Sequence, residues 1–244
     1  MDAFSIRIAG LTAQIHPMFL STKEYCKAYL TEEDPEIVVV TTPEDLRYEQ
    51  EMADVEADEE GLKRRVFTDP FLERASIQRK IAEALLQRGV LLFHGSCVAV
   101  DGLAYLFTAA CGTGKSTHTR FWRETFGDRA IMVNDDKPFL QVTSSGVYAH
   151  GSPWSGKHGL ATNVCLPLKG ICILRRGPEN VIRPVKAEHV MDFLIHQGFA
   201  LDAADGQIFR NDLVTALAKQ IPVWEMECTK DREAAQVAYN AMSR

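Results

Sequence analysis

Nine residues between Ala109 and Thr117, AACGTGKST, are of the types that bind phosphate. Glycines let a backbone turn sharply enough to aim several N–H groups at phosphate oxygens, and a following helix adds the positive end of its dipole. We expect Lys115 to reach the β and γ phosphates of a nucleotide and Ser116 to bind Mg²⁺ through its hydroxyl. The first glycine of the pattern G-x-x-x-x-G-K-[ST] is replaced by Ala109, which fits if its φ angle stays negative.

Two adjacent acids, Asp135 and Asp136, follow an apolar stretch downstream of this loop. A carboxylate at a strand end near a phosphate loop can hold Mg²⁺, and a second can accept the proton of an attacking hydroxyl. Adjacent carboxylates repel, so the pair needs a metal, a cation or a shared proton. We assign Asp136 and Ser116 to the metal as an expectation, although the residues alone do not decide which acid is the base.

The loop GSPWSGKHGL, residues 151–160, is a further candidate. Lys157 and His158 can donate hydrogen bonds to a phosphate or a substrate carboxylate, with Trp154 as a stacking or packing wall. The same residues also fit an ordinary turn that is anchored by a buried tryptophan.

Arg175 and Arg176 end an apolar run, GICIL, that has the character of a buried strand. An arginine at a strand end can neutralise charge on a phosphoryl group. Side chains alternate along a strand, so at most one of the two points into a site. The sequence leaves open which one does, and we take Arg175 as the candidate.

The elements around these residues predict a mixed sheet. Two apolar runs before the loop are joined by Asp101-Gly102, the strongest short signal for a tight hairpin. The strand that leads into the loop is therefore expected to be antiparallel to the one before it. Parallel neighbours would need a crossover of about a dozen residues or more.

Periodicity and turn signals predict the other elements. We expect strands in FSIRIAG, IVVV, RAIMV, LPLKGICILRR and VWEME, a hairpin in FLQVTSSGVYAHG, and helices over 69–89, 186–197, 207–220 and 230–242. We divide the chain into a small N-terminal α+β region, 1–89, and an α/β nucleotide-binding core, 90–244.

Charge and composition exclude several classes of protein. The net charge of −6 disfavours binding to nucleic acid or to an anionic membrane. Thirteen acidic residues against the single Arg47 between Glu32 and Glu60 indicate a solvated loop or helix surface, or a docking surface for a basic partner. There is no signal-peptide pattern and no apolar run of about 18 residues, and the six cysteines lack zinc-site spacing. We expect a cytoplasmic protein with reduced thiols.

Three motifs, HGSCVAVDG, AACGTGKST and VNDD, together resemble the core of the HPr kinase/phosphorylase and phosphoenolpyruvate carboxykinase superfamily over about residues 90–176. Members share a histidine on the strand before the loop, a loop of the form G-x-S-G-x-G-K-[ST] and a two-aspartate motif on the following strand. The resemblance implies a P-loop core with a mixed parallel and antiparallel sheet. It places His94 beside Asp135 and Asp136, which would divide metal binding and general-base work. The resemblance also implies that a run of seven residues binds the nucleotide: Cys111, Gly112, Thr113, Gly114, Lys115, Ser116 and Thr117.

These observations favour a kinase that uses ATP and Mg²⁺ to phosphorylate a hydroxyl of a small molecule, a peptide or a protein. Two alternatives stay open: carboxykinase-like transfer between a nucleotide and an enolate, and a nucleotide-binding regulatory module without catalysis. Known carboxykinases are much longer than this chain, and a pure binder has less need of paired acids. HPr kinases are hexameric, so the resemblance also implies possible self-association.

Overall fold

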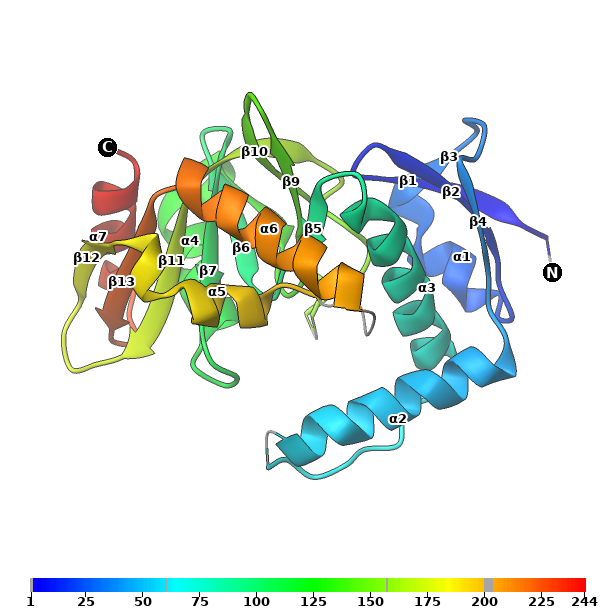
Figure 1. Ribbon diagram of the computed structural model, residues 1–244. Coiled ribbons are helices and arrows are strands. Elements are labelled where there is room, and N and C mark those ends of the chain that lie inside the picture. Colours follow the sequence, from blue (N-terminus) through cyan, green and yellow to red (C-terminus); the bar gives the residue numbers. More distant parts are fainter. Residues whose placement is uncertain (1, 60, 157, 200–203) are drawn as a thin grey trace. The chain divides into compact units, whose positions relative to one another are not determined.

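The computed structural model describes residues 2–59, 61–156, 158–199 and 204–244 (Figure 1). The chain forms two compact units, Met1–Ala84 and Leu85–Arg244. The division falls inside a helix, a few residues before the boundary at 89 that the sequence suggested. None of the described helices is both long enough and apolar enough to span a bilayer.

The first unit is a four-stranded sheet in the order β3-β1-β2-β4 with three helices. Its first two strands form a hairpin whose turn, Ala9-Gly10, has both φ angles positive, at 47° and 83°. The fourth strand then joins β2 in parallel. The elements are β1 (Phe4–Ile8), β2 (Leu11–His16), α1 (Ser21–Tyr25), β3 (Leu30–Thr31), β4 (Ile37–Val40), α2 (Pro43–Glu59) and α3 (Asp69–Leu86).

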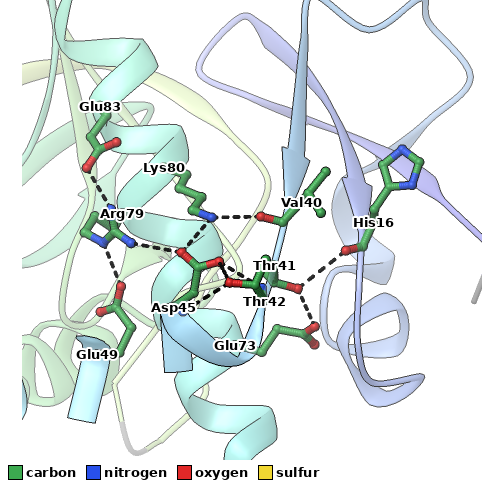
Figure 2. Close-up of polar contacts among 10 residues, drawn as sticks. All are labelled: His16, Val40, Thr41, Thr42, Asp45, Glu49, Glu73, Arg79, Lys80 and Glu83. Carbon is green, nitrogen blue, oxygen red and sulfur yellow. Dashed lines mark hydrogen bonds and ion pairs between the residues drawn. The ribbon is translucent and has the colours of Figure 1, made fainter. Parts of the chain in front are cut away.

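The acidic segment lies mostly on α2, so it forms a helix surface, and a docking role for that surface stays a prediction. Leu46 is its one buried residue among those described. Polar contacts join this helix to α3 (Figure 2). Lys80 donates to Asp45 at 2.7 Å and to the carbonyl of Val40 at 2.8 Å, and Arg79 donates to Glu49 at 2.7 Å.

A buried carboxylate on α3, that of Glu73, links separate segments of the first unit. It accepts hydrogen bonds from the hydroxyl of Thr41 at 2.8 Å, from the hydroxyl of Thr22 and from the backbone N–H of Met18. Figure 2 shows its contact with the segment that follows β4. The three donors satisfy a charge that is fully removed from water.

We expect Glu73→Gln to destabilise the first unit by about 3 kcal/mol, because an amide N–H₂ would face donors that now meet an oxygen, at about 1–3 kcal/mol for each unpaired group. Hydrogen exchange of the β1 and β2 amides measures this effect, because it reports the stability of the first unit separately from that of the second. Glu83→Gln is the matched control, since Glu83 lies on the same helix, is half-buried and pairs with Arg79 outside the Glu73 network. Equal exchange rates in the two variants would show that the buried network carries little stability.

The second unit is built on a nine-stranded mixed sheet. Along the main path the order is β5-β9-β10-β11-β7-β6-β8, and β13 pairs with β11 in parallel and with β12 in antiparallel orientation. The strands are β5 (Val90–Leu92), β6 (Ser96–Val100), β7 (Leu103–Thr108), β8 (Ala130–Asn134), β9 (Phe139–Thr143), β10 (Gly146–His150), β11 (Cys165–Arg176), β12 (Val181–Val185) and β13 (Val223–Cys228). The helices are α4 (Lys115–Phe126), α5 (Met191–Gln197), α6 (Ala204–Gln220) and α7 (Glu233–Met242).

The expected hairpin at Asp101-Gly102 is confirmed. The φ angles there are 52° and 81°, which glycine and aspartate tolerate at a tight turn, and β6 and β7 pair in antiparallel orientation. On its other side β7 pairs with β11 in parallel. The fold is therefore α/β with a mixed sheet, as the sequence predicted.

Helices cover both faces of this sheet (Figure 1). Alternate residues of β7 divide between two cores: Leu106 belongs to the core that includes residues of α5 and α6, and Phe107 to the core that includes residues of α4 and α7. A strand covered on both faces is apolar throughout, which explains the unbroken run LAYLF.

The C-terminal part differs most from the expectation over residues 181–191. Residues 181–185 form β12, which the sequence did not predict, and α5 begins at Met191 rather than near 186. Pro184 lies within β12 and cannot donate to a ladder. The strand tolerates it because β12 pairs with β13 alone among the described strands, so it is an edge strand.

Candidate functional site

The segment between β7 and α4 forms a tight loop at the carboxyl end of β7. Gly112 and Gly114 have φ angles of 72° and 124°, a region that disfavours any side chain. Ala109 is buried and is not among the described non-glycine residues with positive φ. The condition under which alanine fits the first position of the motif is therefore met.

The first turn of α4 places three loop residues at a helix N-terminus. The helix begins at Lys115, and the N–H groups of a helix's first turn have no preceding turn to donate to. These groups and the helix dipole favour an anion. The ammonium of Lys115 donates to the carbonyl of Ala109 at 3.3 Å, which places it across the loop.

The structure brings Arg176 rather than Arg175 to the loop. The guanidinium of Arg176 donates to the carbonyl of Thr113 at 3.2 Å and to that of Gly112. Arg175 pairs with Glu225 on β13 at 2.8 Å. A role for Arg175 toward substrate stays a prediction.

The acid pair follows directly after β8. Asp135 is buried, and its Oδ1 accepts the N–H of Gly156 at 2.6 Å. Its Oδ2 is also buried and has no hydrogen-bond partner among the residues that the structure describes. Burial raises the pKa of Asp135, the hydrogen bond from Gly156 lowers it, and the charge of Asp136 raises it again, with a net result above the ordinary value.

His94 connects the acid pair to the loop. Its Nε2 lies 3.9 Å from Oδ1 of Asp136, and the N–H of Gly95 donates to the carbonyl of Asp136 at 2.8 Å. Burial, and then the positive charge of Lys115, lower the pKa of His94 to about 4, against the opposite effect of Asp136. The imidazole is therefore neutral at pH 7 and within electrostatic reach of both the loop lysine and an acid.

Asn134 is a residue of this site that the sequence reasoning missed. It is fully buried, and its Nδ2 donates to the hydroxyl of Ser152 and to the carbonyl of Trp154, each at 3.1 Å. Its Oδ1 accepts the N–H groups of Asp136 at 2.9 Å and of Lys137 at 2.8 Å. The side chain of Asn134 thus holds the turn that contains Asp135 and Asp136 in place against the 151–160 loop.

The 151–160 loop packs closely on the acids. A Cβ on Gly156 would lie 3.4 Å from both carboxylate oxygens of Asp135, and one on Gly151 would overlap the carbonyl of Thr162. Trp154 is buried, which favours its packing role over an open stacking wall. His158 is exposed, and its charge lowers the pKa of Asp135. Lys157 lies outside the described residues.

We expect Asn134→Leu to loosen the acid turn, because leucine leaves two N–H groups and the loop acceptors without partners at about 1–3 kcal/mol for each buried group. Amide exchange at 151–156 should become faster than in the native chain. Gln141→Leu is a suitable control, because Gln141 also contacts a buried side chain, that of His150, but not the acid turn. Unchanged exchange in the Asn134 variant would contradict the positioning role.

The oxygen ligands at this site fit an Mg²⁺ ion that is also bound by phosphate. They do not fit a metal ion that is held by protein side chains alone. Across the described ranges, no three or more His, Cys, Asp or Glu side chains are grouped to hold a metal ion. Magnesium is usually held by one or two carboxylates with phosphate oxygens and water. Adjacent carboxylates at 135–136 and a hydroxyl at the start of α4 supply ligands of that type.

Comparison with known proteins adds little to this geometry. No protein-family model and no curated protein sequence matches the chain. Among solved structures, the HPr(Ser) kinase/phosphatase from Coxiella burnetii is similar over 62% of this chain and 95% of that chain, with 11% sequence identity and a TM-score of 0.36. A likeness this weak says nothing about the function of this chain.

Proposed function

We propose that this chain is an ATP- and Mg²⁺-dependent kinase that transfers a phosphoryl group to a hydroxyl of a small molecule, a peptide or a protein. The observation that carries the proposal is Oδ2 of Asp135, which is buried and has no hydrogen-bond partner within the described part of the chain. A buried carboxylate oxygen without a donor is costly unless a ligand supplies one. A hydroxyl that gives up its proton during transfer supplies that donor.

The loop and helix would bind the nucleotide. The backbone N–H groups of 112–116 and the ammonium of Lys115 would hold the phosphates, and Cys111 and Thr117 lie at the two ends of this segment. When bound, Mg²⁺ neutralises phosphate charge, and Ser116 and Asp136 are the residues that would hold it. Arg176 steadies the loop through its contacts with two loop carbonyls.

Asp135 and His94 would act on the acceptor hydroxyl and on the phosphoryl group that it receives. Asp135 would accept the proton of the acceptor hydroxyl, since a raised pKa brings a carboxylate closer to the range in which general bases work. The N–H of Gly156 holds this carboxylate in place, and Asn134 holds the turn beside it by accepting the backbone N–H of Asp136. His94, neutral at pH 7, can donate one N–H to the phosphoryl group without adding charge beside Lys115.

The test is ADP formation from ATP by the purified chain with Mg²⁺, with EDTA in its place, and with oxaloacetate or hydroxyl acceptors added. We expect Mg²⁺-dependent ADP formation that needs no oxaloacetate and that rises with a suitable serine peptide or polyol. A strict requirement for oxaloacetate would instead indicate carboxykinase chemistry. Tight ATP binding without ADP from any acceptor would indicate a regulatory module. Self-association and a cytoplasmic location stay predictions of the sequence.

A further inference from the structure

Thr108 places a buried hydroxyl at the point where the sheet leads into the phosphate loop. It is the last residue of β7 and comes directly before Ala109, the first residue of the phosphate motif. Its side chain is fully buried, although the residues before it in the strand, LAYLF, are apolar or aromatic. A buried hydroxyl costs free energy unless it forms a hydrogen bond, so a specific polar contact is expected at this position.

The hydroxyl of Thr108 contacts the backbone of His94. It donates to the carbonyl oxygen of His94 at 3.0 Å. Oε1 of Gln197, the last residue of α5, lies 3.2 Å from the same hydroxyl, which has one proton and donates to one oxygen at a time. Side chains alternate along β7, so Thr108 lies on the same face as Leu106, which packs with residues of α5 and α6. The hydroxyl therefore connects the start of the phosphate loop to the segment that contains His94.

Two backbone hydrogen bonds hold the same segment from other sides. The N–H of His94 donates to the carbonyl of Gln197 at 2.7 Å, and the N–H of Gly95 donates to the carbonyl of Asp136 at 2.8 Å. Of these contacts, the one from Thr108 is made by a side chain, so a substitution can remove it while the backbone bonds remain. The placement of His94 relative to the phosphate loop can therefore be tested by removing a single hydroxyl.

We propose that Thr108 is a positioning residue, whose hydroxyl holds His94 at the distance from the phosphate loop that phosphoryl transfer needs. The inference rests on the proposed function, since it concerns the contact of His94 with the transferring phosphoryl group. Thr108 acts through His94 and not on the substrates, because its side chain is buried and its hydroxyl is bonded to the protein. A small displacement of a group that acts in the transition state lowers kcat more than it weakens substrate binding.

The test is Thr108→Val, which keeps the shape of the side chain and removes the hydroxyl. We expect kcat for ADP formation to fall by about tenfold or more, and the dissociation constant of a non-hydrolysable ATP analogue, from calorimetry, to change by less than about twofold. Thr108→Ser keeps the hydroxyl and should restore kcat close to the native value. Thr215→Val is the matched control with an expected native kcat, since the Thr215 hydroxyl donates to the carbonyl of Asn211 within α6. Thr108→Ala also lacks the hydroxyl and replaces the valine variant if that one fails to fold.

A double-mutant cycle with His94→Ala separates positioning from a general effect on folding. If Thr108 acts through His94, Thr108→Val should lower kcat little further once the imidazole is gone. An equal loss of kcat with and without the imidazole would overturn the proposal, as would a serine variant no more active than the valine variant. Either result would leave the kinase proposal standing. If the native chain formed no ADP, the proposed function would be wrong, and the role of Thr108 with it.

Discussion

Replacing Lys115 by alanine is expected to lower ATP turnover by about a thousandfold, because the ammonium that neutralises charge on the transferring phosphoryl group is lost. ADP formation at saturating Mg²⁺ measures the effect. Lys219→Ala is the control, since Lys219 is an exposed lysine on α6. If the Lys115 variant turned over ATP within a few-fold of the native rate, the loop would have no part in the mechanism.

The same substitution has a second readout that needs no nucleotide. The positive charge of Lys115 is one of the causes that lower the pKa of His94. Its removal should therefore raise the pKa of His94 above about 4 and toward the ordinary value. An NMR titration of the His94 ring protons checks this shift, which confirms that the lysine and the histidine are neighbours even if turnover fails for another reason.

The Asp135→Asn variant is expected to lose about 10²- to 10⁴-fold in kcat, because an amide cannot accept the proton of the acceptor hydroxyl. The asparagine oxygen can still accept the N–H of Gly156, so the loop should stay folded and ATP affinity should change little. In the native chain, activity should fall at acid pH as Asp135 becomes protonated, and its raised pKa places that fall at a higher pH than for an ordinary aspartate.

Asp136→Asn is the matched variant for the metal. We expect it to raise the Mg²⁺ concentration needed for half-maximal turnover more than it lowers kcat, since Asp136 is assigned to the metal and Asp135 to the proton. If Asp135→Asn kept its kcat and Asp136→Asn lost it, the two roles would have to be exchanged.

Local sequence signals predicted the core of this fold well. Asp101-Gly102 fixed the hairpin because few residues other than Gly, Asn and Asp adopt the positive φ angles of such a turn. That turn made β6 and β7 antiparallel, and hence the sheet mixed. The position of the acids at the end of β8 followed from an apolar run that ends in polar residues.

The sequence was less informative where contacts join distant segments. Asn134 holds residues of the 151–160 loop, and nothing in the local pattern says that this loop folds back onto the acid turn. Strand alternation separated Arg175 from Arg176 but did not reveal which face meets the loop.

A crystal structure with a non-hydrolysable ATP analogue and Mg²⁺ in excess tests the central claim most directly. We predict the triphosphate in the cradle of N–H groups at 112–116, the metal at Asp136, and open space for an acceptor hydroxyl beside Asp135. A loop that stays closed by the side chains of Lys115 and Arg176, with the analogue bound elsewhere or not at all, would contradict the kinase proposal.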